Sequence, residues 1–164
     1  RDRRELLRSA DVFTLELCEA RSRHVLLHGD DPFTELHFTD GELRLSLEQA
    51  LRSLARQLRQ AVLSSVSDES ARPSARQLLS QSIDRLAVVA ANVLRLVGQD
   101  GALCEADLIG RLAELAQVEA QPTLKWVSCL REGDVLDDPV PALADLLMLL
   151  DAATSVVDRI GAAQ

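Results

Sequence analysis

Aromatic residues are scarce in this chain of 164 residues, which contains three phenylalanines, one tryptophan and no tyrosine. Glycine and proline are also few, at 7 and 5 residues, so the chain lacks the frequent turn signals that separate the short strands of β-rich proteins. Apolar residues nevertheless make up 47% of the sequence, and leucine, alanine and valine supply most of them. This balance favours an all-α fold that packs through aliphatic side chains as a single helical bundle.

Cysteine is also rare, and the three that occur, Cys18, Cys104 and Cys129, are odd in number and far apart in the sequence. This pattern argues against a disulfide framework or a zinc site and favours buried thiols in a reducing cytoplasm. No uninterrupted apolar run approaches the length of about 18 residues that predicts a transmembrane helix, so we expect a cytoplasmic protein with no membrane partner. The first residues are charged and include no initiator methionine, which predicts a domain of a longer protein.

The net charge of −8 is unevenly distributed along the chain. Residues 1–98 contain 14 acidic and 14 basic residues, whereas residues 99–164 contain 12 acidic and 4 basic residues. The C-terminal part therefore carries the whole negative excess, and we expect it to repel nucleic acid unless a local basic face compensates. Nucleic acid as a partner is left open by this distribution.

Apolar residues recur at helical spacing over most of the chain and predict about four main helices, with short helices between them. We expect residues 1–11 to form a linker or short helix and residues 12–164 to form the helical bundle domain. The central helices are predicted at residues 41–65, 75–97 and 142–160, and shorter ones at residues 20–28, 105–119 and 122–133. Residues 86–94 are apolar nearly all round, which predicts that the second central helix is the most buried.

Capping signals predict where several of these helices begin and end. Residues 12–17 alternate in polarity, which fits either a short strand or the first turn of a helix. Gly29 is expected to end the helix that precedes it, with His28 close to the negative end of the helix dipole. Asp40 is expected to cap the start of the first central helix.

Residues 21–60 contain the most specific pattern of the chain, a turn followed by a long helix. The turn consists of Arg23, His24, Val25, Leu26, Gly29, Asp30, Asp31, Pro32 and Phe33. The helix contributes Leu43, Arg44, Leu45, Leu47, Glu48, Leu51, Arg52, Leu58, Arg59 and Gln60. Together these residues resemble the C-terminal helical region of bacterial nucleotidyltransferase-domain proteins, in the superfamily of DNA polymerase β-like minimal nucleotidyltransferases.

The resemblance implies a non-catalytic helical accessory or substrate-binding domain that lies beside a catalytic α/β domain and helps to close its nucleotide or acceptor-substrate cleft. The catalytic signature of that family, a Gly-Ser turn followed by an Asp-x-Asp pair, does not occur in the sequence. We therefore expect no enzyme activity from this chain alone and no cofactor within it, with Mg²⁺ entering only if a catalytic domain is attached. The expected partner is a catalytic nucleotidyltransferase domain or chain, and a homodimer is the alternative assembly.

Four arginines share one side of the predicted long helix. Arg52, Arg56 and Arg59 are spaced at i, i+4 and i+7, and Arg44 lies two turns before them. Because arginine matches phosphate oxygens bidentately, this arginine stripe is a candidate for substrate or phosphate contact. The alternative is a solvated face that pairs with nearby acids or with acids of the C-terminal third. The scarcity of aromatic residues for base stacking favours that second interpretation.

Arg23 and His28 form an Arg-x4-His pattern that resembles the catalytic motif of HEPN ribonucleases, which are also helical bundles. In that motif the histidine can move a proton and the arginine can stabilise the transition state. An HEPN-like ribonuclease toxin or its partner bundle is therefore one alternative function, and a structural dimerisation bundle is another. His24 and His28 lie near Asp30 and Asp31, but they lack a third defined ligand, so no metal site is predicted.

Overall fold

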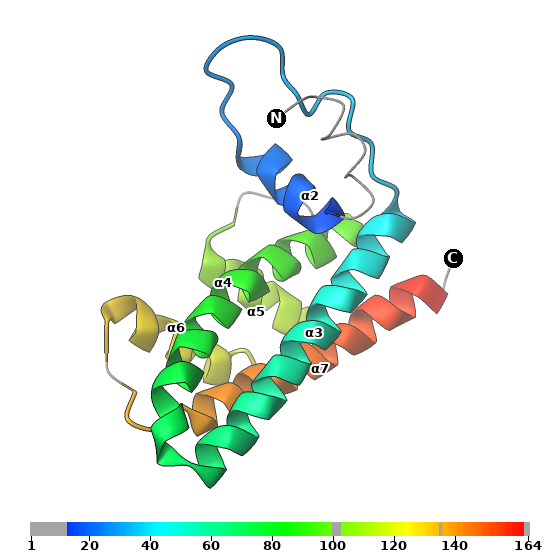
Figure 1. Ribbon diagram of the computed structural model, residues 1–164. Helices are drawn as coiled ribbons and strands as arrows, with labels where there is room; N and C mark the ends of the chain where they lie inside the picture. Colours follow the sequence, from blue (N-terminus) through cyan, green and yellow to red (C-terminus); the bar gives the residue numbers. More distant parts are fainter. Residues whose placement is uncertain (1–12, 100–102, 135, 163–164) are drawn as a thin grey trace.

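The computed structural model describes residues 13–99, 103–134 and 136–162, except the side chains of residues 22, 23, 161 and 162. Within these ranges the chain forms six α-helices and one 3₁₀ helix, without any strand (Figure 1). The elements are α2 (Thr14–Arg23), α3 (Asp40–Ser67), η1 (Glu69–Ala71), α4 (Arg72–Leu96), α5 (Glu105–Ala116), α6 (Gln121–Glu132) and α7 (Val140–Ala162). The predicted all-α bundle is confirmed, whereas the linker predicted at residues 1–11 lies outside the described residues.

Helices α3 and α4 form a long hairpin that η1 closes at one end (Figure 1). Helix α7 lies against α3 and runs antiparallel to it, because Arg52 of α3 meets Asp158 while Arg59 meets Asp151. Besides this extensive α3 contact, α7 packs against α4, α5 and α6. Helix α2 packs on α3 at the end of the bundle opposite η1.

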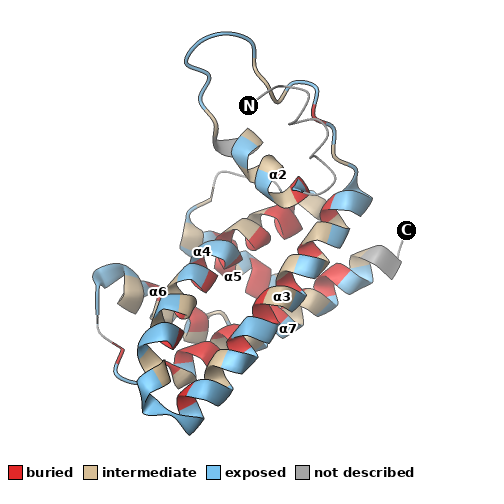
Figure 2. Ribbon diagram, viewed as in Figure 1, coloured by how far each residue is buried: buried red, intermediate tan, exposed pale blue. Residues whose placement is uncertain are grey.

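The core between these helices is aliphatic, as the composition predicts. Its fully buried large side chains come from four helices and include Leu47, Leu51, Leu58, Leu79, Leu86, Leu94, Ile109, Leu112, Leu143, Leu146 and Leu149. Figure 2 shows the buried residues where the helices face one another. Residues 86–94 are buried except for Val88 and Ala91, which confirms the prediction for this helix. Since each buried leucine contributes roughly 1.5–3 kcal/mol, this core is the main source of stability.

Helix α3 begins with a capping box that lies one residue earlier than predicted. The Glu42 N–H donates to the side-chain oxygen of Thr39 at 3.2 Å, and the Thr39 N–H donates to the Glu42 carboxylate at 2.9 Å. The N-cap is therefore Thr39, and the prediction of Asp40 is wrong because Asp40 already lies in the first turn. The hydrogen bonds from Thr39 lower the pKa of Glu42, since they stabilise its ionised form.

The predicted helix at residues 20–28 is wrong, because the helix lies earlier in the chain. Helix α2 begins at Thr14 and ends at Arg23. For the described residues of the segment 12–17, this excludes the alternative of a short strand. His24 has an extended backbone with ψ 149°, and the chain continues as a loop to Thr39. Gly29 does adopt the predicted positive φ of 85°, but within this loop rather than as a helix cap. His28 is consequently not at a helix C-terminus.

Helix α7 is apolar enough, by length and composition, to cross a membrane between Val140 and Ile160. The sequence criterion of an uninterrupted apolar run did not identify it, because acidic residues interrupt the run. In the bundle, α7 buries Leu143, Leu146 and Leu150 against neighbouring helices, while Leu147 is half-buried. A core helix needs the same composition as a membrane span, so this feature is weak evidence for a membrane partner.

Candidate functional site

The arginine stripe predicted for phosphate contact lies on α3. Its two N-terminal members, Arg44 and Arg52, both form ion pairs with Glu48 of the same helix. Arg44 Nη1 lies 3.2 Å from Glu48 Oε2, and Arg52 Nη2 lies 2.8 Å from Glu48 Oε1. Glu48 thus stands between two arginines, one turn from each. Phosphate would have to compete with this carboxylate for either guanidinium group.

The stripe also connects α3 to α7. Arg59 Nη2 donates to both carboxylate oxygens of Asp151, at 2.6 and 2.9 Å, and Arg52 Nη2 lies 3.6 Å from Asp158. Arg56 lies between these two arginines and is exposed, and no acid of the described chain pairs with it. Three of the four arginines of the stripe therefore form ion pairs with carboxylates. Arg56 is the member whose guanidinium group is available to a ligand.

A groove that the sequence did not predict follows α4 between α2, α3 and α5. Its smaller part has a volume of about 130 Å³ and is lined by Leu15, Glu16, Glu19, Ala50, Leu54, Arg85, Val88 and Val89. Its larger part has a volume of about 490 Å³ and is lined by Glu19, Asp84, Arg85, Ala87, Val88, Leu103, Glu105, Leu108 and Arg131. The two parts adjoin at Glu19, Arg85 and Val88, and both apolar and charged side chains line them.

Arg131 on α6 fixes one wall of this groove by joining three helices. Its guanidinium group donates to Glu105 on α5, with Nη2 2.6 Å from Oε1, and to Asp84 on α4. These hydrogen bonds, the one to Glu105 first, raise the pKa of Arg131 above its ordinary value. Arg85 lines the same groove from α4, is exposed, and pairs with no acid in the described ranges. The groove thus combines a fixed wall with a guanidinium group that is available to a ligand.

Sequence reasoning missed Arg85 and Arg131 because their setting depends on distant residues. The partners of Arg131 lie 26 and 47 positions away in the chain, on two other helices. No spacing pattern signals such a cluster, whereas the arginine stripe was visible because its members repeat on a single helix.

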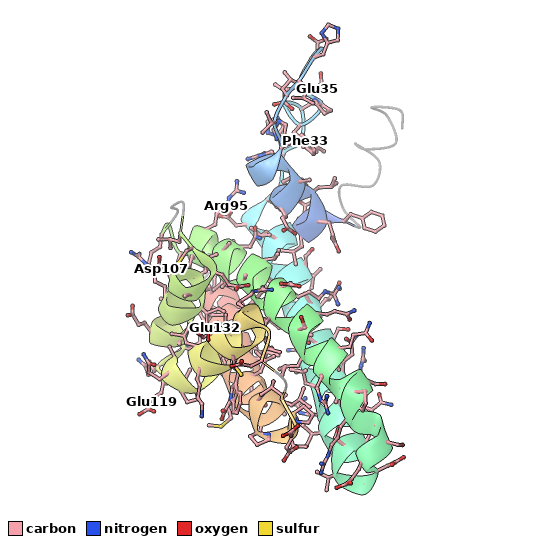
Figure 3. All side chains as sticks on the ribbon, turned by 90° about the vertical axis from the view of Figure 1, so that its left-hand side faces the viewer. Phe33, Glu35, Arg95, Asp107, Glu119 and Glu132 are labelled. Atoms are coloured by element: carbon pink, nitrogen blue, oxygen red, sulfur yellow. The ribbon has the colours of Figure 1, made fainter. Side chains whose placement is uncertain are left out.

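The turn that carries the family resemblance is a loop between α2 and α3 that projects from the bundle, and Figure 3 shows Phe33 and Glu35 on it. His24 anchors this loop, since its Nδ1 bonds to the Arg21 carbonyl at 2.8 Å and its Nε2 lies 3.2 Å from Asp31 Oδ1. Its ring also packs on Phe33, with 4.6 Å between centroids. Asp31 Oδ1 accepts the Phe33 N–H at 2.8 Å. The loop is therefore held in shape by its own residues.

The structure does not bring the predicted ribonuclease pair together by any described contact. His28 is exposed in the loop, and the side chain of Arg23 lies outside the described residues. His24 and Asp31 do meet, but the described chain contains no group of three or more histidine, cysteine or acidic residues that could hold a metal ion. The carboxylate of Asp31 instead stabilises its own turn, which is the usual role of an acid beside a proline.

The remaining polar side chains of interest act between or within helices. The Trp126 indole N–H donates to Asp145 Oδ2 at 2.7 Å and so joins α6 to α7. The three cysteines are free; Cys18 is buried, and its burial raises the pKa of its thiol. Cys104 is exposed and Cys129 half-buried, so the prediction of buried thiols is wrong for these two.

The geometry thus offers two candidate contact surfaces, the groove along α4 and the α3 face around Arg56. Neither surface identifies a reaction by itself, and the family resemblance of residues 21–60 remains a prediction. No protein-family model matches this chain, and no curated protein or solved structure is similar enough to count as a match.

Proposed function

We propose that this chain is a non-catalytic helical accessory domain that lies beside a catalytic nucleotidyltransferase domain or chain and helps to close its substrate cleft. The resemblance of residues 21–60 supplies the partner in this proposal. Nucleotidyl transfer needs carboxylates that hold metal ions and groups that align the phosphates, and these belong to the partner. The helical domain contributes a rigid contact surface.

The observation that carries the proposal is the groove along α4. Its apolar floor includes Leu54, Val88 and Val89, which suit contact with an apolar surface or substrate group. Along its wall, Arg131 joins α4, α5 and α6. Arg85 adds a guanidinium group that forms no ion pair with a described acid, although Glu19 and Asp84 line the same groove, and guanidinium groups match phosphate oxygens.

The arginine stripe has a smaller part in this proposal than the sequence suggested. Arg44, Arg52 and Arg59 are engaged by carboxylates, so their main effect is on packing within α3 and between α3 and α7. Arg56 keeps the phosphate-contact role that the sequence predicts for the stripe. Arg56 and Arg85 are accordingly the two positions at which substrate contact is proposed.

The test begins from the coding sequence around this chain, in which we expect a Gly-Ser turn and an Asp-x-Asp pair upstream in the same frame or in a neighbouring gene. The encoded catalytic domain and this chain are then assayed together and separately, with nucleoside triphosphates and Mg²⁺. We expect no transfer by this chain alone, and transfer by the pair that falls when the helical chain is left out.

Matched arginine variants locate the contact. Arg85→Gln should raise the KM of the pair for its substrate, while Arg111→Gln, an exposed arginine on α5, should leave it unchanged. Transfer by the isolated chain that is abolished by Asp30→Asn or Asp31→Asn would overturn the proposal. The absence of any catalytic domain in the neighbouring coding sequence would also count against it.

A second candidate function is a structural dimerisation bundle, and one observation favours it. Val25, Leu26 and Leu27 are consecutive apolar residues that remain exposed in the loop between α2 and α3. For the ribonuclease alternative, the structure describes His28, which is exposed in the loop, but not the side chain of Arg23, so that alternative stays a prediction.

A further inference from the structure

Both ring nitrogens of His24 lie close to oxygen atoms that accept hydrogen bonds. Nδ1 lies 2.8 Å from the carbonyl oxygen of Arg21, and Nε2 lies 3.2 Å from Asp31 Oδ1. A neutral imidazole has a single N–H, so it can donate to one of these oxygens while its other nitrogen turns a lone pair towards the second. The doubly protonated imidazolium presents an N–H to both. The arrangement in the structure is therefore that of the charged histidine.

Asp31 is positioned for this contact by its own turn. The same Oδ1 atom accepts the Phe33 N–H at 2.8 Å, and the Phe33 ring packs on the His24 ring with 4.6 Å between centroids. The side chains of His24 and Asp31 are 27% and 36% exposed. Water therefore reaches the ion pair, and a change in the pH of the solution acts on it directly.

Asp31 is the described acid that forms an ion pair with His24. The Arg21 guanidinium group is engaged elsewhere, since its Nη1 donates to the Leu36 carbonyl at 2.9 Å, and the Glu42 carboxylate belongs to the capping box of α3. The other acidic and basic described side chains of the last two turns of α2, the loop and the first turn of α3 form no ion pair with His24: Glu19, His28, Asp30, Glu35, His37 and Asp40. The charge of His24 therefore acts on the loop through Asp31.

We propose that His24 and Asp31 form a pH-sensitive clamp on the loop between α2 and α3. When His24 is protonated, the ion pair joins the end of α2 to Asp31 and closes residues 25–30 into a short loop. When His24 loses its proton, the remaining N–H stays with the Arg21 carbonyl, and a lone pair on Nε2 faces the Asp31 carboxylate. Because histidine changes its charge between about pH 5 and 8, the clamp is lost as the pH rises through this range.

The clamp determines how the exposed apolar run of the loop is held. The exposed fractions of this run are 78% for Val25, 48% for Leu26 and 92% for Leu27, so the bundle covers little of it. No backbone group of residues 25–29 forms a hydrogen bond to another described residue. The contact between His24 and Asp31 is therefore the polar contact that restrains this segment, and its loss should make the run more mobile. This clamp does not depend on the proposed accessory function.

Nuclear magnetic resonance at about pH 5.5 and at about pH 8.5, on either side of the histidine range, tests the clamp. Cross-relaxation between the rings of His24 and Phe33 should be present at the lower pH and weaken at the higher one. The Cα order parameters of Leu26 and Leu27 should fall towards about 0.6, the value of flexible backbone. Carbon relaxation is the appropriate measurement, because exposed amides exchange too fast for detection at alkaline pH.

Three variants identify the groups responsible. His24→Asn keeps a donor near the position of Nδ1 but carries no charge, so its loop should be equally mobile at both pH values. Asp31→Asn keeps an acceptor for the Phe33 N–H and should also remove the response to pH. His28→Asn is the matched control, since His28 lies within the segment and is exposed, and this variant should respond like the wild type.

A ring contact and order parameters that are the same at both pH values in the wild-type chain would overturn the proposal. A response that persists in His24→Asn, or that His28→Asn removes, would overturn it as well. Unchanged far-ultraviolet circular dichroism of the variants shows that the bundle is folded and that the effect is confined to the loop.

Discussion

The bundle of α3, α4 and α7 and the loop between α2 and α3 use the same apolar residues in opposite ways. In the bundle, leucines such as Leu58 and Leu86 are fully buried, because apolar positions repeat over many turns and meet those of other helices. In the loop, Val25 and Leu27 are exposed although their sequence is just as apolar. The difference shows that burial follows from a repeated apolar pattern that meets a partner helix, which the short apolar run of the loop does not find among the described helices.

The largest expected effect comes from deleting a core leucine. Leu58→Ala should lower the free energy of unfolding by about 3 kcal/mol, because it removes a fully buried side chain and leaves a cavity. Leu27→Ala makes the same chemical change at a site that is 92% exposed, so its effect should be within about 0.5 kcal/mol. Urea denaturation of both variants at low protein concentration measures the difference. Equal losses would show that the loop leucine is buried like the core.

The next effect concerns the start of α3, where the bundle meets the loop. Thr39→Ala should lower the free energy of unfolding by about 1 kcal/mol, because the Glu42 N–H loses its side-chain acceptor. Asp40→Ala, at the residue that the sequence predicted as the cap, should have a smaller effect. Thermal unfolding of the two variants decides between the caps, and a larger loss for Asp40→Ala would contradict the observed capping box.

A smaller effect is expected for the arginine stripe. Arg59→Ala should cost about 0.5 kcal/mol, since its pair with Asp151 is about half exposed. Arg56→Ala should cost less, because no described acid pairs with Arg56. A double-mutant cycle of Arg59→Ala with Asp151→Ala isolates the pair, and a coupling free energy of zero would show that it does not hold α3 to α7.

The smallest effect is a loss of stability in acid. Hydrogen bonds lower the folded-state pKa of Glu42 and of Asp68, the latter through Ser70. A lowered folded-state pKa means that the ionised group stabilises the fold above its unfolded pKa, and that this contribution is lost as the pH falls through the folded-state value. Stability should therefore decline below about pH 4, the ordinary range of carboxyl groups. Thr39→Ala should make the free energy of unfolding depend less on pH in this range, because Glu42 loses a hydrogen bond that lowers its pKa. Urea denaturation at a series of pH values measures this dependence.

The helices of the bundle could be predicted from the sequence because local signals and tertiary packing agree there. Leu47, Leu51 and Leu58 repeat at helical spacing, and the structure buries all three. The predicted helix at residues 20–28 is wrong beyond Arg23, where α2 ends, and the structure leaves Val25, Leu26 and Leu27 exposed. Periodicity alone does not distinguish such a run from a helix turn.

The candidate site was less predictable than the fold. The arginine stripe could be identified because its residues share one helix, but its pairing with Asp151 and Asp158 depends on the antiparallel packing of α7. Arg85 and Arg131 gave no signal, because a groove forms only after α4, α5 and α6 have packed. The spacing of residues in the sequence predicts which side chains share a face of one helix. It does not predict a site that residues of several helices form together.

Native-state hydrogen exchange tests most directly the claim that one chain combines a cooperative bundle with a loop segment, residues 25–28, whose backbone groups form no hydrogen bond to the described chain. At low protein concentration, the amides of residues 25–28 should exchange at nearly the rate of an unfolded chain, while amides at Leu58, Leu86 and Leu146 should exchange only through global unfolding. Continuous protection from residue 20 to residue 28, as a helix would give, would contradict this account.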